Sequence, residues 1–250
     1  MINYLLVHGA WHGGWCWKRV ARLLRAAGHE VFTPTLTGLG ERVHLLNTDV
    51  ELDTHIQDVL GVLKYEDLRN VVLVGHSYGG MVISGVAEKA AERLAHLVYL
   101  DAFVPNDGQS SADFQPAEVL AMRKEKTRTE GDGYKLPCSP AENFGITNEE
   151  DLAWVKQRLN PHPFKTMLNT VQLTNPKAAQ IPRTYIYCNN PPIGPFGQFA
   201  ERLRTDESWQ YRELATGHDA MITEPEQLAE LLLEFGEKSS VGKSNTVRSA

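Results

Sequence analysis

Residues 71–80 read VVLVGHSYGG, an apolar run that leads into the pattern Gly75-x-Ser77-x-Gly79. The run predicts a buried strand, and the apolar residues that follow it at helical spacing predict a helix. A serine between such a strand and helix stands on a very tight turn, where flanking glycines remove side chains that would clash. The turn also places it at a helix N-terminus, where N–H groups favour developing negative charge. The pattern therefore predicts Ser77 as a catalytic nucleophile.

Short apolar runs alternate with helical patterns on both sides of this motif. Such alternation predicts a mainly parallel sheet that is flanked by helices. The expected helices cover residues 17–27, the segments that begin near residues 54 and 80, and the segment from about 223 to 235. The expected strands cover residues 4–7, 30–33, 71–74, 97–100, 184–188 and 209–214.

The pattern changes in residues 105–176, which are polar, punctuated by proline and without clear strands. Short helices are expected there near residues 116–126 and 149–159, and we interpret the segment as an inserted helical cap. The core is then expected to consist of residues 1–104 and 177–236, so that residues 1–236 form a single domain. Residues 237–250 are polar and small, and they are predicted to form a disordered tail.

The composition is that of an average globular protein, with 42% hydrophobic and 22% charged residues among 250. The formal net charge of −6 argues against a nucleic-acid partner, which would require a basic face. The N-terminus does not resemble a signal peptide, and no apolar run approaches the ~20 residues of a membrane span. We therefore expect a cytoplasmic protein with no membrane partner.

The three cysteines, Cys16, Cys138 and Cys188, lie far apart and predict neither a disulfide framework nor a zinc site. No metal or organic cofactor is expected.

A serine hydroxyl needs a positioned base near pH 7. Of the nine histidines, His218 follows the last expected strand and precedes the last expected helix, which is the chain order of Ser-His hydrolases with this strand–turn–helix motif. His218 is therefore the predicted general base. His76 is expected to be a packing residue, and His8 and His12 are secondary candidates for lining the pocket.

The acid that would orient the histidine has several candidates. Asp101 ends the strand that directly follows the nucleophile helix, and the carboxyl ends of neighbouring parallel strands lie side by side. It is our first candidate for holding the imidazole tautomer, although a carboxylate in this turn would also serve as a structural cap. Glu201 is the second candidate. A dyad in which Asn190 or water orients the histidine is a further alternative.

Acyl transfer also needs hydrogen-bond donors aimed at the oxygen that becomes negative. One predicted donor is the backbone N–H of Tyr78, the residue after the nucleophile. The second is expected in the loop 8–14, HGAWHGG, whose glycines allow close approach of a ligand. Ala10 is the predicted donor there.

Three stretches carry a family resemblance: residues 5–15 (LLVHGAWHGGW), 75–81 (GHSYGGM) and 217–221 (GHDAM). Together they resemble the plant methyl-ester esterase and hydroxynitrile lyase branch of the α/β-hydrolases. They are still more similar to bacterial esterases of that branch, including those that hydrolyse pyrethroid esters and the carbamate carbendazim. The resemblance extends to about residue 236. It implies the α/β-hydrolase fold, Ser77 and His218 as catalytic residues, and Ala10 and Tyr78 as oxyanion donors.

The sequence departs from this branch at two places. Plant members carry an aspartate in the region that corresponds to residues 189–191, whereas this chain has none there and carries Asp101 where plant members have a small residue. The departure is consistent with an acid that has moved to the neighbouring strand. Hydroxynitrile lyases of the branch hold cyanide with a lysine directly after the catalytic histidine, and Asp219 occupies that position here.

The resemblance and the motifs together predict a serine hydrolase that cleaves a small hydrophobic or aromatic carboxylic ester or carbamate. The expected course is attack by Ser77, an acyl- or carbamoyl-enzyme, and hydrolysis by water that His218 activates. Lyase activity, and non-catalytic binding of a small molecule on the same fold, are the alternatives. Apolar residues in and beside the cap are candidates for the pocket wall: Phe103, Phe114, Met122, Phe144, Trp154, Phe164 and Met167.

Overall fold

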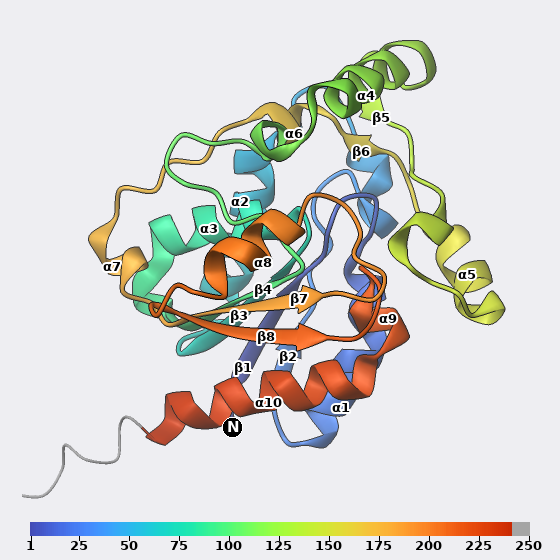
Figure 1. Ribbon diagram of the computed structural model, residues 1–250. Coiled ribbons are helices and arrows are strands. Elements are labelled where there is room, and N and C mark those ends of the chain that lie inside the picture. The colour runs from blue at the N-terminus through green and yellow to red at the C-terminus, as the bar shows by residue number, and fades with distance from the viewer. Residues whose placement is uncertain (242–250) are drawn as a thin grey trace, which may run out of the picture.

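A six-stranded parallel sheet forms the centre of the molecule (Figure 1). The computed structural model describes residues 1–241, with side chains through residue 235. All neighbouring strands of this sheet pair in parallel, in the order β2-β1-β3-β4-β7-β8, which confirms the predicted sheet type. The strands are β1 Asn3–Val7, β2 Glu30–Phe32, β3 Val71–His76, β4 Leu94–Leu100, β7 Arg183–Cys188 and β8 Trp209–Leu214.

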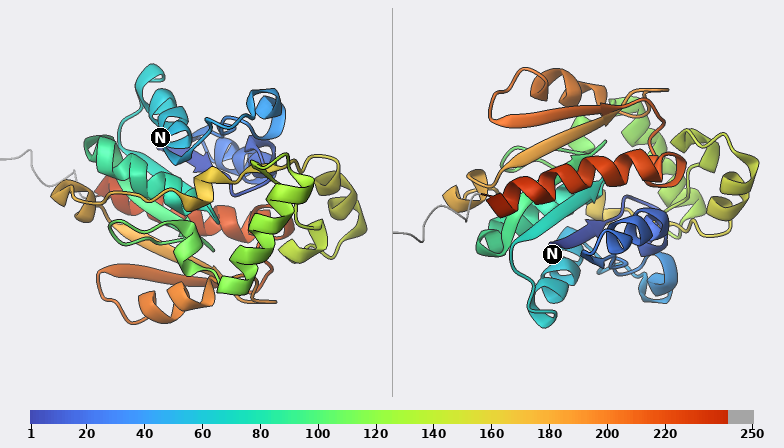
Figure 2. Two further views of the ribbon diagram at one scale, coloured as in Figure 1. Left: turned by 90° about the horizontal axis from the view of Figure 1, so that it is seen from above. Right: turned by 90° about the horizontal axis from the view of Figure 1, so that it is seen from below.

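Helices cover both faces of the sheet (Figure 2). Because both faces are covered, all six residues of β3 are buried, as its unbroken apolar run predicts. The helix α1 Lys18–Ala26 buries the stripe Val20, Ala21 and Leu24, and it ends just before Gly28, whose left-handed φ of 87° suits a helix end. On one face lie α1 Lys18–Ala26 and α10 Pro225–Val241, and on the other lie α2 Leu52–Tyr65, α3 Gly79–Ala90 and α8 Gly197–Leu203.

The strand order reverses between β1 and β3. From β1 the chain runs outward to β2, and it then returns to β3 and builds the other half of the sheet. Loops that leave the carboxyl ends of strands at such a reversal diverge and leave a crevice between them. The loop 8–14 after β1 and Ser77 after β3 flank this crevice.

The segment between β4 and β7 carries four helices, of which the first three lie on the side of the carboxyl ends of the strands and the last directly precedes β7 at its amino end (Figure 1). It also contains two two-residue strands, β5 Lys135–Leu136 and β6 His162–Pro163, which pair antiparallel. The expectation that this segment lacks strands is wrong at these positions, because two residues show no periodicity. The division into a core and a cap at residues 105–176 stays a prediction. The helices are α4 Ala117–Glu130, α5 Glu149–Lys156, α6 Lys165–Leu168 and α7 Pro176–Ala179.

The C-terminal helix is longer than predicted. The short helix α9 Ala220–Thr223 precedes α10, which continues through Gly236 to Val241, so the predicted disordered tail is wrong for residues 237–241. A glycine inside a helix costs only about 1 kcal/mol relative to alanine, which is too little to end it. Residues 242–250 lie outside the described residues. None of the helices within residues 1–241 is both long and apolar enough to span a membrane.

Candidate active site

Ser77 stands on the turn between β3 and α3. Its φ of 55° lies in the left-handed region, which costs a non-glycine residue about 1–2 kcal/mol. A Cβ at Gly75 would lie 2.6 Å from the carbonyl oxygen of Gly79, and a Cβ at Gly79 would lie 2.9 Å from that of His8, so both positions require glycine. The neighbouring strand holds the turn, because the Ser77 N–H donates to the carbonyl of Leu100 at 3.2 Å.

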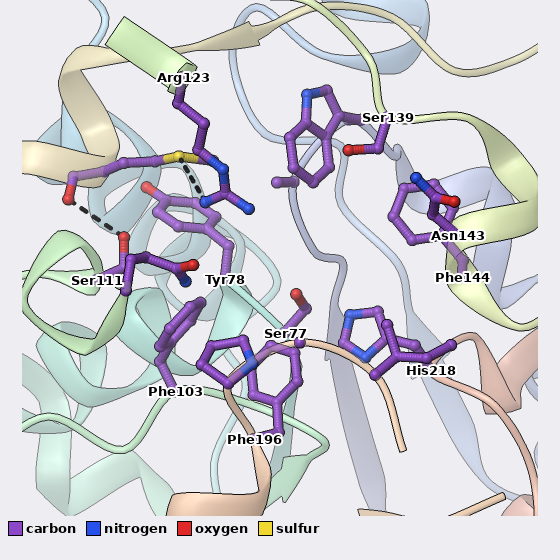
Figure 3. Close-up of a pocket in the computed structure, with 17 residues that line it drawn as sticks. Ser77, Tyr78, Phe103, Ser111, Arg123, Ser139, Asn143, Phe144, Phe196 and His218 are labelled. Atoms are coloured by element: carbon purple, nitrogen blue, oxygen red, sulfur yellow. Dashed lines mark hydrogen bonds between the residues drawn. The ribbon is translucent and has the colours of Figure 1, made fainter. Parts of the chain in front are cut away.

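His218 and Asp101 meet at the same edge of the sheet. The register of β3 and β4 places residues 77 and 101, one past each strand, side by side. His218 comes from the loop between β8 and α9, and its Nδ1 lies 2.6 Å from Oδ2 of Asp101. The other carboxylate oxygen accepts a hydrogen bond from the Cys188 N–H at 3.4 Å. Figure 3 shows Ser77 and His218 next to each other in one pocket.

This contact fixes the orientation of the imidazole. Because Nδ1–H donates to Asp101, the lone pair of a neutral His218 lies on Nε2, the atom that can accept a proton from a hydroxyl. The ring of Phe196 stacks on the imidazole at 4.8 Å between centroids and 10° between planes. Asp101 is fully buried, and burial raises the pKa of its carboxyl above the usual value, although the hydrogen bond to His218 works in the opposite direction.

The other candidates for the acid lie elsewhere. Glu201 lies on α8 and is exposed to solvent. Asn190 is also exposed, and its backbone N–H donates to the carbonyl of Thr216 at 3.0 Å. Among the side chains of residues 1–235, Asp101 provides the carboxylate that contacts the His218 ring.

Ala10 and Tyr78 both line the pocket beside Ser77. Neither backbone N–H has a hydrogen-bond partner within the described part of the chain. They come from the two loops that flank the crevice, one after β1 and one after β3. The pair is therefore available to donate to an oxygen bound next to Ser77.

A buried histidine–carboxylate pair beneath these groups was not predicted from the sequence. His12 and His8 do not line the pocket but lie under it, fully buried. His12 Nδ1 lies 2.8 Å from the carbonyl oxygen of Ala10, and Nε2 lies 3.0 Å from Oδ2 of Asp219. Both partners are acceptors, so both ring nitrogens carry protons and His12 is an imidazolium. The pair joins the loop of Ala10 to the loop of His218.

The charge of His12 results from two opposed effects. Burial lowers the pKa of His12, but the Asp219 carboxylate outweighs burial and raises it above the usual 6.5. A group with a raised pKa in the folded state stabilises the fold below its unfolded pKa, and this contribution is lost as the pH rises through the folded pKa. The contribution of His12 is therefore fully present below about pH 6.5 and is lost at higher pH, as its folded pKa is passed.

Asp219→Asn is expected to lower the free energy of unfolding by about 3 kcal/mol near pH 6, because it leaves a buried imidazolium without its counter-charge. The deficit should be smaller at pH 9 than at pH 6, because the wild type loses this contribution as the pH rises through the folded pKa of His12. Urea unfolding at the two pH values measures it. Asp53→Asn is the matched control, because it removes an exposed carboxylate from the Asp53–Lys89 pair and should cost less than about 1 kcal/mol. Equal deficits at both pH values would contradict a charged His12.

His76, the last residue of β3, links the nucleophile turn to the His218 loop. Its Nε2–H donates to the carbonyl oxygen of His218 at 2.9 Å, and the two rings lie 4.4 Å apart. Burial lowers the pKa of His76 well below its usual value, so the ring is neutral. His76, His218 and Asp219 bring possible ligand atoms within 4.8 Å of one another. We assign this cluster to the hydrogen-bond network, because His218 is held by Asp101 and Asp219 by His12.

The pocket that contains Ser77 and His218 encloses about 720 Å³ including its open mouth. Of the apolar side chains expected at its wall, Phe103, Phe144 and Met167 line it. The others lie outside: Phe114 packs against Phe103 and Phe199, Trp154 packs against Trp15, Met122 is half exposed, and Phe164 is buried elsewhere. Lining residues that were not predicted as pocket wall are Trp11, Ser111, Gln115, Arg123, Ser139, Asn143, Ile193, Gly194, Pro195 and Phe196.

A parallel sheet with a serine on the turn after β3 and a histidine after β8 defines the class of α/β-hydrolases. Residues 4–231 match the sequence model described as the alpha/beta hydrolase family, and the chain belongs to that family.

Within the family the chain is a carboxylesterase-type hydrolase. It is 41% identical over 244 residues to the carbendazim hydrolyzing esterase of Nocardioides sp. (strain SG-4G), covering 94% of this chain and all of that protein. It is 28% identical to salicylic acid-binding protein 2 of Nicotiana tabacum over 94% of this chain and 97% of that protein. Among solved structures, an extracellular alpha/beta-hydrolase from a Paenibacillus species superposes with a TM-score of 0.82 at 30% identity, covering 94% of this chain and 99% of the other.

Proposed function

We propose that this protein is a serine esterase that cleaves a small hydrophobic or aromatic carboxylic ester, or a carbamate, through an acyl- or carbamoyl-enzyme. One observation carries the proposal: the strained Ser77 shares a pocket with His218, whose Nδ1 lies 2.6 Å from the buried carboxylate of Asp101. In this assignment Ser77 is the nucleophile, His218 the general base and Asp101 the orienting acid.

The geometry supports a two-step reaction. The Ser77 hydroxyl attacks the carbonyl carbon while His218 takes its proton, and the N–H groups of Ala10 and Tyr78 donate to the oxygen that becomes negative. His218 then gives the proton to the leaving alcohol or amine as the bond to the carbonyl carbon breaks. A water molecule, deprotonated by His218, repeats the attack and releases the acid with Ser77 regenerated.

The substrate class follows from the pocket wall and from the relatives. Phe103, Phe144, Met167 and Phe196 give the cavity an apolar and aromatic lining that suits a planar or hydrophobic group. The relative at 41% identity is named for hydrolysis of carbendazim. Carbendazim and a pyrethroid ester are therefore suitable first substrates.

Lyase activity is less well supported. Asp219 stands where the lyases of this branch place the lysine that holds cyanide. Its carboxylate lies beneath the pocket in contact with His12 and does not line the cavity. The position directly after the catalytic histidine thus carries a carboxylate in place of the lyase cation.

A fluorophosphonate probe tests the proposal. We expect one adduct per chain, located on Ser77 by mass spectrometry of the peptides, because a phosphonyl group mimics the acyl-enzyme. His218→Ala should label far more slowly, since the serine then lacks its base. Ser111→Ala is the matched control: Ser111 lines the same pocket, but its hydroxyl donates to the carbonyl of Met167 at 3.2 Å, so its loss should leave labelling intact. An adduct on Ser111, or none, would overturn the assignment.

A further inference from the structure

Arg123 is the one formally charged side chain at the wall of the pocket, whose described lining contains no aspartate, glutamate or lysine. It lies on α4, and Figure 3 shows its guanidinium projecting into the pocket on the side of Tyr78 and Ser111. The protein as a whole is acidic, with a net charge of −6, so this cation does not belong to a generally basic surface. A positive group at this place needs an explanation of its own.

The guanidinium has few partners within the described residues. Its Nη1 donates to the Met167 sulfur at 3.9 Å, and its Cζ lies 5.8 Å from the centre of the Trp11 ring. No carboxylate among the side chains described, those of residues 1–235, forms an ion pair with it, whereas Arg19 pairs with Asp151. A guanidinium carries five N–H donors, and a thioether is a weak acceptor. Most of the donors of Arg123 therefore remain available to a molecule in the pocket.

Burying part of a guanidinium without a counter-charge costs free energy, because the charge loses part of its hydration. Burial accordingly lowers the pKa of Arg123, and no nearby carboxylate opposes this effect. The contacts of this guanidinium with an aromatic face and a sulfur provide no full negative charge. A bound ligand with a negative charge would provide one and would compensate the guanidinium for its lost hydration.

We propose that Arg123 binds a carboxylate of the substrate, so that the preferred esters carry a negative charge at a position separate from the scissile bond. The proposal rests on the proposed ester hydrolysis at Ser77. A carboxylate is favoured because the planar guanidinium matches it with two parallel hydrogen bonds. A single arginine balances one negative charge, and the surrounding wall is neutral, with Ser111, Gln115, Ser139 and Asn143 as its other polar members.

Two matched pairs of substrates test this. The first pair varies the acyl group: the mono-4-nitrophenyl ester of adipic acid against 4-nitrophenyl hexanoate, which has the same chain length and no charge. The second pair varies the alcohol: hexanoate esters of 4-hydroxybenzoic acid and of its methyl ester. For each pair the measurement is the ratio of kcat/KM for the charged ester to that for the neutral ester. A general loss of activity or fold cancels in this ratio.

We expect the wild type to prefer the charged member of at least one pair by about 10- to 100-fold, the range that hydrogen bonds to charged groups provide. Arg123→Gln should abolish the preference and Arg123→Lys should retain part of it. Lys124→Gln is the control, because it removes a positive charge from an exposed position on the same helix and should leave the ratio unchanged.

The outcomes separate this proposal from the one it rests on. Hydrolysis of the neutral esters with no Arg123-dependent preference in either pair would overturn the role of Arg123 and leave the esterase intact. A preference that Lys124→Gln also abolishes would point to long-range charge and would likewise overturn a direct contact. If neither charged nor neutral esters are hydrolysed, or Ser77→Ala is as active as the wild type, the proposed function itself fails.

Discussion

Asp101→Asn is expected to lower the turnover number by about 10⁴-fold. The physical reason is the tautomer of His218. An ionised carboxylate accepts the Nδ1–H bond at 2.6 Å and stabilises the imidazolium that forms when the serine loses its proton. An amide at this position carries no charge and can present N–H donors that favour the wrong tautomer. Steady-state kinetics with a 4-nitrophenyl ester measure the loss.

The variant should remain folded. Burial raises the pKa of Asp101, so any stability that the group contributes is fully present only below its unfolded pKa near 3.8 and is lost as the pH rises through its folded pKa. A neutral amide of the same size therefore costs little stability at pH 7. Glu201→Gln is the control for the acid and should leave kcat near the wild-type value, because Glu201 is exposed. A near-normal rate for Asp101→Asn would show that another group orients His218.

Whether a feature of this site can be predicted from the sequence depends on how far apart along the chain its residues lie. The elbow is local: strand, glycines and serine lie within ten consecutive residues, so their geometry follows from one stretch of chain. His218 is recognised from its place between the last strand and the last helix. Asp101 is harder, because its role depends on β4 lying between β3 and β7, and only the strand order places it against the His218 loop.

The features that sequence reasoning missed are contacts between distant segments. His12 and Asp219 are 207 positions apart and each belongs to a motif with another explanation, so neither residue indicated a buried pair. Arg123 lies in a run of charged residues, a pattern that predicts a solvent-exposed helix face. Only the structure shows that Arg123, unlike the charged residues next to it, lines the pocket. The aromatic residues of the cap show the same limit: composition predicts an apolar wall but not which rings form it.

Substitutions at Ser77, which stands on a strained turn, should change both the turnover number and the stability. The expected loss of turnover is the largest effect predicted for this protein. Ser77→Ala and Ser77→Gly should both lower the turnover number by about 10⁶-fold, because both remove the nucleophile. Their stabilities should differ. At a φ of 55° an alanine suffers the same steric strain as the serine, whereas glycine does not, so Ser77→Gly should be more stable than Ser77→Ala by about 1 kcal/mol.

Urea unfolding of the two variants measures this difference. Lys126, which is exposed on α4, provides the control. The Lys126→Gly protein should be less stable than the Lys126→Ala protein by about 1 kcal/mol, as expected for a helix interior. If the glycine variant is the more stable of the two at position 77 but the less stable at position 126, backbone strain at Ser77 lowers the stability of the wild-type protein. If glycine is the less stable replacement at both positions, the turn is relaxed, and the position of the Ser77 hydroxyl needs an explanation other than backbone strain.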